Sequence, residues 1–276
     1  MSLEPGFRFS QSSLAAYTSC PRSFALRYIQ KLSWPAVVSE PVLEHERHLE
    51  NGSRFHLLIQ QYLAGMSPEI ISRTISDDVL RDWWNKFINN DPVKVQNGKK
   101  LVEYTLSTRI HGYPIDAKYD LLVIHPDESC TIFDWKTNKV IPSREKLENS
   151  LQTMVYRLVL AQAGASLTGV NEFLPEKIRM MYWFVEYPDQ PVELVYSPAA
   201  LENDRRKLTR LIQEIDSLPL DAFALTSNLK MCELCQYRSY CDRGIRAGNW
   251  DSGTDIDEAE DLLDILNLDD IGEIAF

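Results

Sequence analysis

The stretch "IFDWKTNK", residues 132–139, decides the fold, because an apolar strand pattern ends there with an acidic and a basic side chain two positions apart. Alternate side chains of an extended strand share a face, so Ile132, Asp134 and Lys136 point the same way. The two aromatic residues between them point to the other face. A carboxylate and an ammonium on one face of an apolar strand indicate either a surface ion pair or a functional site. A D-x-K pattern alone usually marks the surface ion pair.

A second acid precedes this stretch, in "YDLLVI", residues 119–124. Asp120 and Asp134 are separated by about one strand, a turn and half a strand, so a hairpin would bring both carboxylates to one point. Two close carboxylates repel each other unless a cation lies between them, and Mg²⁺ and Mn²⁺ prefer such oxygen ligands. With Lys136 beside the ion, the pattern predicts phosphodiester hydrolysis.

The sequence on both sides predicts an α/β fold with a mixed central sheet flanked by helices. Residues 1–92 are expected to be mostly helical, with helices at 43–64 and 76–90. Strands are expected at 100–110, 113–124, 130–137, 177–187 and 191–197, and helices at 143–164 and 198–217. We therefore expect one domain over 1–250, made of a helical region 1–92, an α/β core 93–197 and a segment 198–250.

Charge sets residues 251–276 apart from the rest of the chain. The net charge is −11, yet this tail holds ten acids and no Lys or Arg, which leaves 29 basic against 30 acidic residues elsewhere. A near-neutral body can still present a basic groove, so a phosphate-rich substrate is not excluded. The tail is expected to be disordered by default. The alternatives are an acidic amphipathic helix that docks on a protein partner or covers the groove as a DNA mimic.

The 276 residues and their 44% apolar content support a sizeable core. No apolar run is long enough to span a membrane, and "MSLEPGFRFS" lacks the features of a signal peptide. These features predict a soluble, cytoplasmic protein.

Three of the five cysteines form a C-x2-C-x5-C motif, "CELCQYRSYC", at Cys232, Cys235 and Cys241. In a cytosolic chain such spacing favours metal binding over disulfides, and a fourth ligand is then needed. Cys130 lies in the apolar strand and is expected to be a small buried hydrophobic residue.

"YDLLVI" followed by "IFDWKTNK" resembles the PD-(D/E)XK nuclease superfamily, in its RecB-like branch. The resemblance implies an α-β-β-β-α-β core of the restriction-endonuclease type, with Asp120 on the second strand and Asp134 and Lys136 on the third. It implies a metal-dependent deoxyribonuclease that uses Mg²⁺ or Mn²⁺. Ala117 stands where the family usually has Gly, so Asp116, on the same face as Asp120, is the alternative acid.

Two further motifs extend this resemblance. "LQTMVYRLVL" supplies Gln152 and Tyr156, similar to the family's Q-x3-Y, which implies that Gln152 orients Lys136 or the water and that Tyr156 contacts the DNA backbone. "GSRFH" resembles the family's G-x3-H, which implies that His56 coordinates the metal. The alternative for His56 is an ordinary histidine bonded to backbone.

"SLAAYTSCPRSFALRY" resembles the start of the iron-sulfur members of this branch, which include the CRISPR-associated four-cysteine exonucleases and the nuclease domain of bacterial helicase-nuclease subunits. This layout implies that Cys20 joins Cys232, Cys235 and Cys241 in binding a [4Fe-4S] cluster that clamps the two ends of the core together. Zinc is the alternative occupant, since four-cysteine zinc sites are common.

The expected function is therefore a DNA nuclease. The resemblance to the iron-sulfur exonucleases implies that it acts as an exonuclease on single strands or duplex ends. The expected setting is DNA repair, recombination or CRISPR-type processing. Arg22, Arg27, Tyr28 and Lys31 would line a single-strand channel, although ordinary helix surface explains them equally well. A non-catalytic DNA-binding or adaptor module of a repair complex, with the same fold, is one alternative. An RNA nuclease is another.

Overall fold

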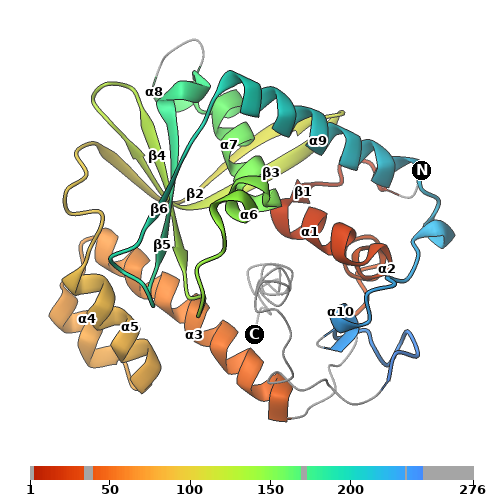
Figure 1. Cartoon of the computed structure of the whole chain (residues 1–276), viewed down its shortest axis with the longest axis horizontal. Helices are drawn as coiled ribbons and strands as arrows, with labels where there is room; N and C mark the ends of the chain where they lie inside the picture. Colours follow the sequence, from red (N-terminus) through yellow and green to blue (C-terminus); the bar gives the residue numbers. More distant parts are fainter. Residues whose placement is uncertain (1–2, 34–39, 169–172, 234, 245–276) are drawn as a thin grey trace. The chain divides into compact units, whose positions relative to one another are not determined.

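The computed structural model of the protein describes residues 3–33, 40–168, 173–233 and 235–244 (Figure 1). The chain forms two compact units, Asn51–Arg210 and a smaller one made of Met1–Glu50 with Leu211–Phe276. No described helix combines the length and apolar character that a membrane span requires. The acidic tail at 251–276 lies outside the described residues, so its predicted roles stay predictions, as does the single domain over 1–250.

The larger unit is built on a mixed sheet, as the sequence predicts. Each strand pairs with the next one in sequence, antiparallel except for the parallel pair β4–β5. The strands are β2 (Lys99–Ile110), β3 (Tyr113–Ile124), β4 (Cys130–Lys136), β5 (Ile178–Phe184) and β6 (Val192–Val195).

Helices lie on both sides of this sheet. They are α3 (Glu40–Leu63), α4 (Pro68–Thr74), α5 (Asp78–Asn89), α6 (Arg144–Asn149), α7 (Leu151–Ala163), α8 (Ala165–Thr168), the 3₁₀ turn η2 (Pro175–Lys177) and α9 (Pro198–Ser217). Figure 1 shows α7 and α5 on opposite sides of the sheet, and α7 contacts β2, β3 and β5.

The single helix expected over 143–164 is two helices, because Ser150 interrupts it. Ser150 has extended backbone angles, φ −67° and ψ 147°, and its hydroxyl accepts a hydrogen bond from the Thr153 N–H at 3.1 Å. This is the geometry of a helix N-cap, which satisfies one of the unpaired N–H groups of the first turn. The break starts α7 at Leu151, so Gln152 lies in its first turn.

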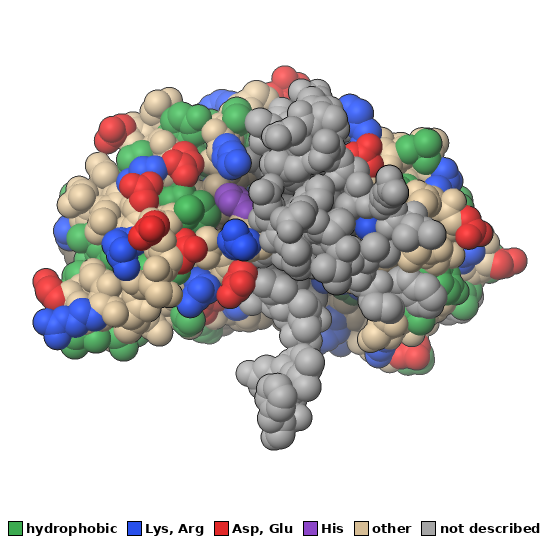
Figure 2. Space-filling model, turned by 90° about the horizontal axis from the view of Figure 1, so that it is seen from below, with side chains coloured by type: hydrophobic (Ala, Val, Ile, Leu, Met, Phe, Trp, Pro, Cys, Tyr) green, Lys and Arg blue, Asp and Glu red, His purple; other side chains and the backbone are tan. Residues whose placement is uncertain are grey.

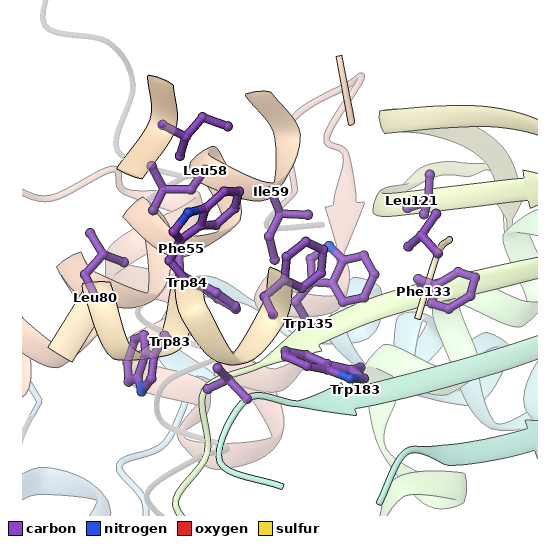
Figure 3. Close-up of a cluster of buried hydrophobic side chains, with 14 of the residues drawn as sticks. Phe55, Leu58, Ile59, Leu80, Trp83, Trp84, Leu121, Phe133, Trp135 and Trp183 are labelled. Carbon is purple, nitrogen blue, oxygen red and sulfur yellow. The ribbon is translucent and has the colours of Figure 1, made fainter. Parts of the chain in front are cut away.

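An aromatic core fills the space between the sheet and the helices α3 and α5 (Figure 3). Phe55 of α3 stacks on Trp183 of β5 with ring centroids 6.5 Å apart, and Phe87 of α5 meets the Trp135 ring edge-on at 5.6 Å. Phe133 lies in the same core. Because Phe133 and Trp135 anchor one face of β4 here, the intervening Asp134 is turned to the opposite face, toward α7.

The smaller unit begins with β1 (Phe9–Ser10), α1 (Gln11–Ser19), α2 (Pro21–Phe24) and the π-helical turn η1 (Ala25–Ile29). Ser10 and Ser13 form a reciprocal capping box at the start of α1. Pro21 opens α2, where its missing N–H costs nothing. From the other end of the chain come the last part of α9, the 3₁₀ turn η3 (Leu220–Ala222) and α10 (Lys230–Glu233).

Direct contacts tie the two ends of the chain together within this smaller unit. The Arg22 N–H donates to the Ala224 carbonyl at 3.0 Å, and the Tyr237 hydroxyl donates to the Leu32 carbonyl at 3.0 Å. The Phe24 and Phe223 rings stack with centroids 5.9 Å apart. These contacts bring the segment around Cys20 and the segment that carries the other three metal-motif cysteines into one structure.

Candidate active site

The candidate site forms where β3 and β4 separate. Their backbone pairing runs from Ile124–Cys130 to Leu121–Phe133 and ends there. Asp120 and Asp134 are the next residues on the two strands. The Trp135 N–H donates to Asp120 Oδ2 at 2.9 Å, so the Asp120 side chain takes the place of a strand partner. The antiparallel hairpin expected from the sequence is present, and it makes Asp120 and Asp134 the first residues beyond the last strand pair.

His56, on α3, closes this point from the side of the aromatic core. Its Nδ1 lies 3.2 Å from Asp120 Oδ1, and its Nε2 lies 3.0 Å from the Trp135 carbonyl oxygen. Burial lowers the pKa of His56, but the carboxylates of Asp120, Asp134 and Glu103 together outweigh burial and raise that pKa to about 9. Burial raises the pKa of Asp120, but His56, the Trp135 N–H and the Lys136 charge together lower it below its usual value. Both ring nitrogens face acceptors, and a ring nitrogen that binds a metal ion must first lose its proton.

Asp134, Lys136 and Gln152 form a closed polar triangle on the face that looks toward α7. Lys136 Nζ lies 3.1 Å from Asp134 Oδ2 and donates to Gln152 Oε1 at 2.8 Å. The Gln152 amide donates to Asp134 Oδ1 at 2.8 Å. Asp134 and Gln152 are 2% and 7% exposed, so this is no surface ion pair. The amide therefore fixes the carboxylate and the ammonium relative to each other.

Tyr156 and Asp116 have other surroundings. Tyr156 is 5% exposed, its ring centroid lies 5.0 Å from that of Tyr119, and its carbonyl accepts from the Tyr119 hydroxyl at 2.9 Å. Its contact with DNA stays a prediction. Asp116 accepts a hydrogen bond from Ser107. Of the two acids considered for β3, the structure brings Asp120 to His56 and the end of β4.

One residue of the site was missed in the sequence: Glu103, on β2. Ligand atoms of His56, Glu103 and Asp120 all lie within 4.8 Å of one another, and among the described residues no other group of three His, Cys, Asp or Glu side chains does so. Burial and the Asp120 charge raise the pKa of Glu103. An imidazole with two carboxylates is a donor set that divalent cations such as Mn²⁺ accept, so these residues fit a metal ion. No signal in the sequence marks Glu103, because the strand pairing that selects it is a tertiary property.

The four predicted cluster ligands lie near one another in the smaller unit. Cys20 follows α1 directly, Cys232 lies in α10, and Cys235 and Cys241 lie in the turns after it. Burial raises the pKa of the Cys232, Cys235 and Cys241 thiols, to about 11 for Cys235, and the neighbouring Cys20 raises all three further. All are free thiols.

Cys130 is completely buried, as the sequence predicts. Burial alone raises the pKa of its thiol to about 12. A neutral thiol in this position behaves as a small hydrophobic side chain.

Of the basic residues after Cys20, Arg22 and Arg27 are partly exposed and Lys31 is exposed. The Arg27 guanidinium lies 5.4 Å from the centre of the Tyr28 ring, which also packs on Phe24 at 5.6 Å. On the face in Figure 2, the described Lys and Arg side chains are interspersed with Asp and Glu. The single-strand channel stays a prediction.

Comparison with known protein families identifies the family of the chain. A family model described as the PD-(D/E)XK nuclease superfamily matches residues 8–242, a range that contains every site residue discussed above. No curated protein sequence is significantly similar to the chain.

Two solved structures are similar over most of the chain. SSO0001 is 15% identical, with 87% of each chain covered and a TM-score of 0.41. A structure from Eubacterium rectale named "Putative exonuclease" is 10% identical, with 76% of this chain and 80% of that one covered and a TM-score of 0.49.

Proposed function

The chain belongs to the PD-(D/E)XK nuclease superfamily, and from that premise we propose that it is a metal-dependent DNA nuclease of the RecB-like branch, acting as an exonuclease. The observation that carries the proposal is the placement of Asp120 and Asp134 directly after the last β3–β4 strand pair, with Lys136 held beside Asp134 by Gln152. The resemblance of the motifs to exonucleases of that branch supports the mode of cleavage.

In this proposal Asp120, Asp134 and His56 hold Mg²⁺ or Mn²⁺. Such an ion supplies Lewis-acid stabilisation of the phosphoryl group and makes a water molecule more acidic. The protein fixes the ligands in advance: the Trp135 N–H holds Asp120 at 2.9 Å, and the Gln152 amide holds Asp134 at 2.8 Å. Neither carboxylate has to reorganise when substrate arrives, which is the condition for efficient electrostatic catalysis.

Lys136 has the role of stabilising the negative charge that develops on the phosphoryl oxygens during in-line attack. Its ammonium is positioned by Asp134 Oδ2 and Gln152 Oε1, at 3.1 and 2.8 Å. Lys136 is a compact point charge, and two contacts restrict its flexible stem to one place. Gln152 is thus a positioning residue, since it acts through Lys136 and Asp134.

We also propose that Cys20, Cys232, Cys235 and Cys241 bind a [4Fe-4S] cluster, on the resemblance of their layout. Anaerobic purification should yield about four iron and four sulfide per chain. One zinc and no iron would contradict the cluster.

A non-catalytic adaptor is the second candidate. An adaptor would have no need for an amide that locks a buried carboxylate to a lysine. An RNA nuclease would share the site and differ only in substrate. Activity on defined substrates separates all three functions.

The test is incubation of the protein with end-labelled single-stranded DNA, duplex DNA and RNA, with Mn²⁺ or with chelator, alongside Asp134→Asn. We expect metal-dependent shortening of DNA from its ends and no cleavage by the variant. Binding of DNA without cleavage would indicate the adaptor, and preferential cleavage of RNA would change the substrate class.

A further inference from the structure

We propose that Glu103 is an additional ligand of the metal site, and that Lys118 competes with the metal ion for its carboxylate. The inference rests on the proposed function, because it concerns the same ion. It adds a ligand from β2, the neighbour of β3 on the side away from β4. Three successive strands would then each contribute one carboxylate.

The position of Glu103 follows from the strand pairing. Val102 pairs with Leu121 and Tyr104 pairs with Tyr119, so Glu103 falls across from Asp120, at a left-handed backbone position (φ 51°) where the regular pairing is interrupted. Two like charges directly opposite each other on neighbouring strands destabilise a sheet unless a cation compensates them. A cation between Glu103 and Asp120 removes this repulsion.

The spacing of the donor atoms fits one ion. Ligand atoms of His56, Glu103 and Asp120 lie within 4.8 Å of one another. An octahedral ion with ligands at about 2.1 Å has them about 3 Å apart when adjacent and about 4.2 Å apart when opposite. Small side-chain rotations therefore suffice to bring these atoms onto one ion.

In the structure, Lys118 partly compensates the negative charges of Glu103 and Asp120. Its Nζ lies 3.0 Å from Glu103 Oε2, across a diagonal of the β2–β3 pair. The Lys118 side chain is 47% exposed and that of Glu103 only 19%. An ion pair with so exposed a partner contributes little stability, so a metal ion can displace the ammonium while the carboxylate stays at the site. Metal binding and the Glu103–Lys118 ion pair are mutually exclusive in this arrangement.

The proposal predicts opposite effects for the two partners. Glu103→Gln removes a charged ligand and should weaken Mn²⁺ binding about tenfold. Lys118→Met removes the competitor and should tighten binding several-fold. In the double variant the gain from Lys118→Met should disappear, because the carboxylate for which it competed is gone. If Glu103 and Lys118 were only a structural pair, both single changes would act in the same direction.

The measurement is titration of the full chain with MnCl₂ without DNA, reading the free ion by its electron paramagnetic resonance signal. Glu69→Gln, at an exposed residue of α4, is the matched control and should bind as the parent does. A cooperative thermal unfolding transition, measured for each variant with chelator present, checks that the variant is folded. Should Glu103→Gln fail to fold, Lys118→Met decides: tighter binding supports the proposal, and unchanged or weaker binding overturns it.

Asp120→Asn separates this proposal from the function on which it rests. If Asp120→Asn loses Mn²⁺ and Glu103→Gln binds within twofold of the parent, Glu103 is no ligand while the nuclease site stands. If the parent binds no Mn²⁺, both proposals fail. Weakened binding in both variants supports Glu103 as a ligand.

Discussion

Gln152 is the residue on which the electrostatics of the site depend most directly. Its side chain hydrogen-bonds both Asp134 and Lys136, at 2.8 Å each. Its amide presents an acceptor to the ammonium and a donor to the carboxylate, and an apolar side chain can do neither. Without it, the carboxylate and the ammonium would each lose a hydrogen-bond partner in a buried place.

We therefore expect Gln152→Leu to lower the cleavage rate by about 10- to 100-fold, the usual cost of losing a group that orients a ligand. Single-turnover cleavage of labelled DNA with Mn²⁺ measures this rate. Gln162→Leu, at an exposed residue of the same helix that contacts Thr108 on β2, is the control and should cleave at the parent rate. Equal rates for both variants would remove the positioning role.

Sequence motifs point to most of the candidate site residues. They do not point to Glu103, which strand pairing alone brings to the site. Asp120, Asp134 and Lys136 lie where alternation and hairpin length place them. Glu103 has no motif, and the same acid one position along β2 would face the opposite side of the sheet. Only the β2–β3 register brings it opposite Asp120.

Among the elements, the break between α6 and α7 has the clearest consequence for the site. Apolar periodicity continues through Ser150, so the sequence predicts one helix where the structure has two. Periodicity reports which residues face the core, and it does not report a change of axis between two helices that share that core. The strands are predicted within a few residues because each alternates and ends at a turn.

We expect Ser150→Ala to lower the free energy of unfolding by about 1 kcal/mol, through loss of the cap on the Thr153 N–H. It should also slow cleavage, because Gln152 lies in the turn that this cap fixes. Urea denaturation and single-turnover cleavage measure the two effects. Ser143→Ala, which uncaps α6 in the same way, should cost similar stability and leave cleavage unchanged. Slower cleavage in both variants would point to a general loss of stability.

At the scale of the whole molecule, charge is distributed unevenly along the chain. Residues 251–276 carry ten of the 40 acids and no base. Their place relative to the site is outside the described residues. A segment of that charge attached to a nuclease should repel a polyanion or occupy its groove, and either effect weakens DNA binding.

Deletion of residues 251–276 should therefore tighten binding of single-stranded DNA by the remaining chain. The gain should shrink as salt is added, since screening removes charge repulsion first. Fluorescence anisotropy with labelled DNA at low and high salt measures both trends. Unchanged affinity at low salt would mean that the tail neither repels DNA nor covers the groove, leaving a disordered end or a protein-docking helix as the remaining predictions.

The central claim is that Lys136, fixed between Asp134 and Gln152, serves the cleavage of DNA. Single-turnover cleavage of end-labelled DNA with saturating Mn²⁺, for the parent, Lys136→Ala and the exposed control Lys94→Ala, tests it most directly. We predict a loss of at least about a hundredfold for Lys136→Ala with the control at the parent rate. Cleavage by Lys136→Ala at the parent rate would contradict the account.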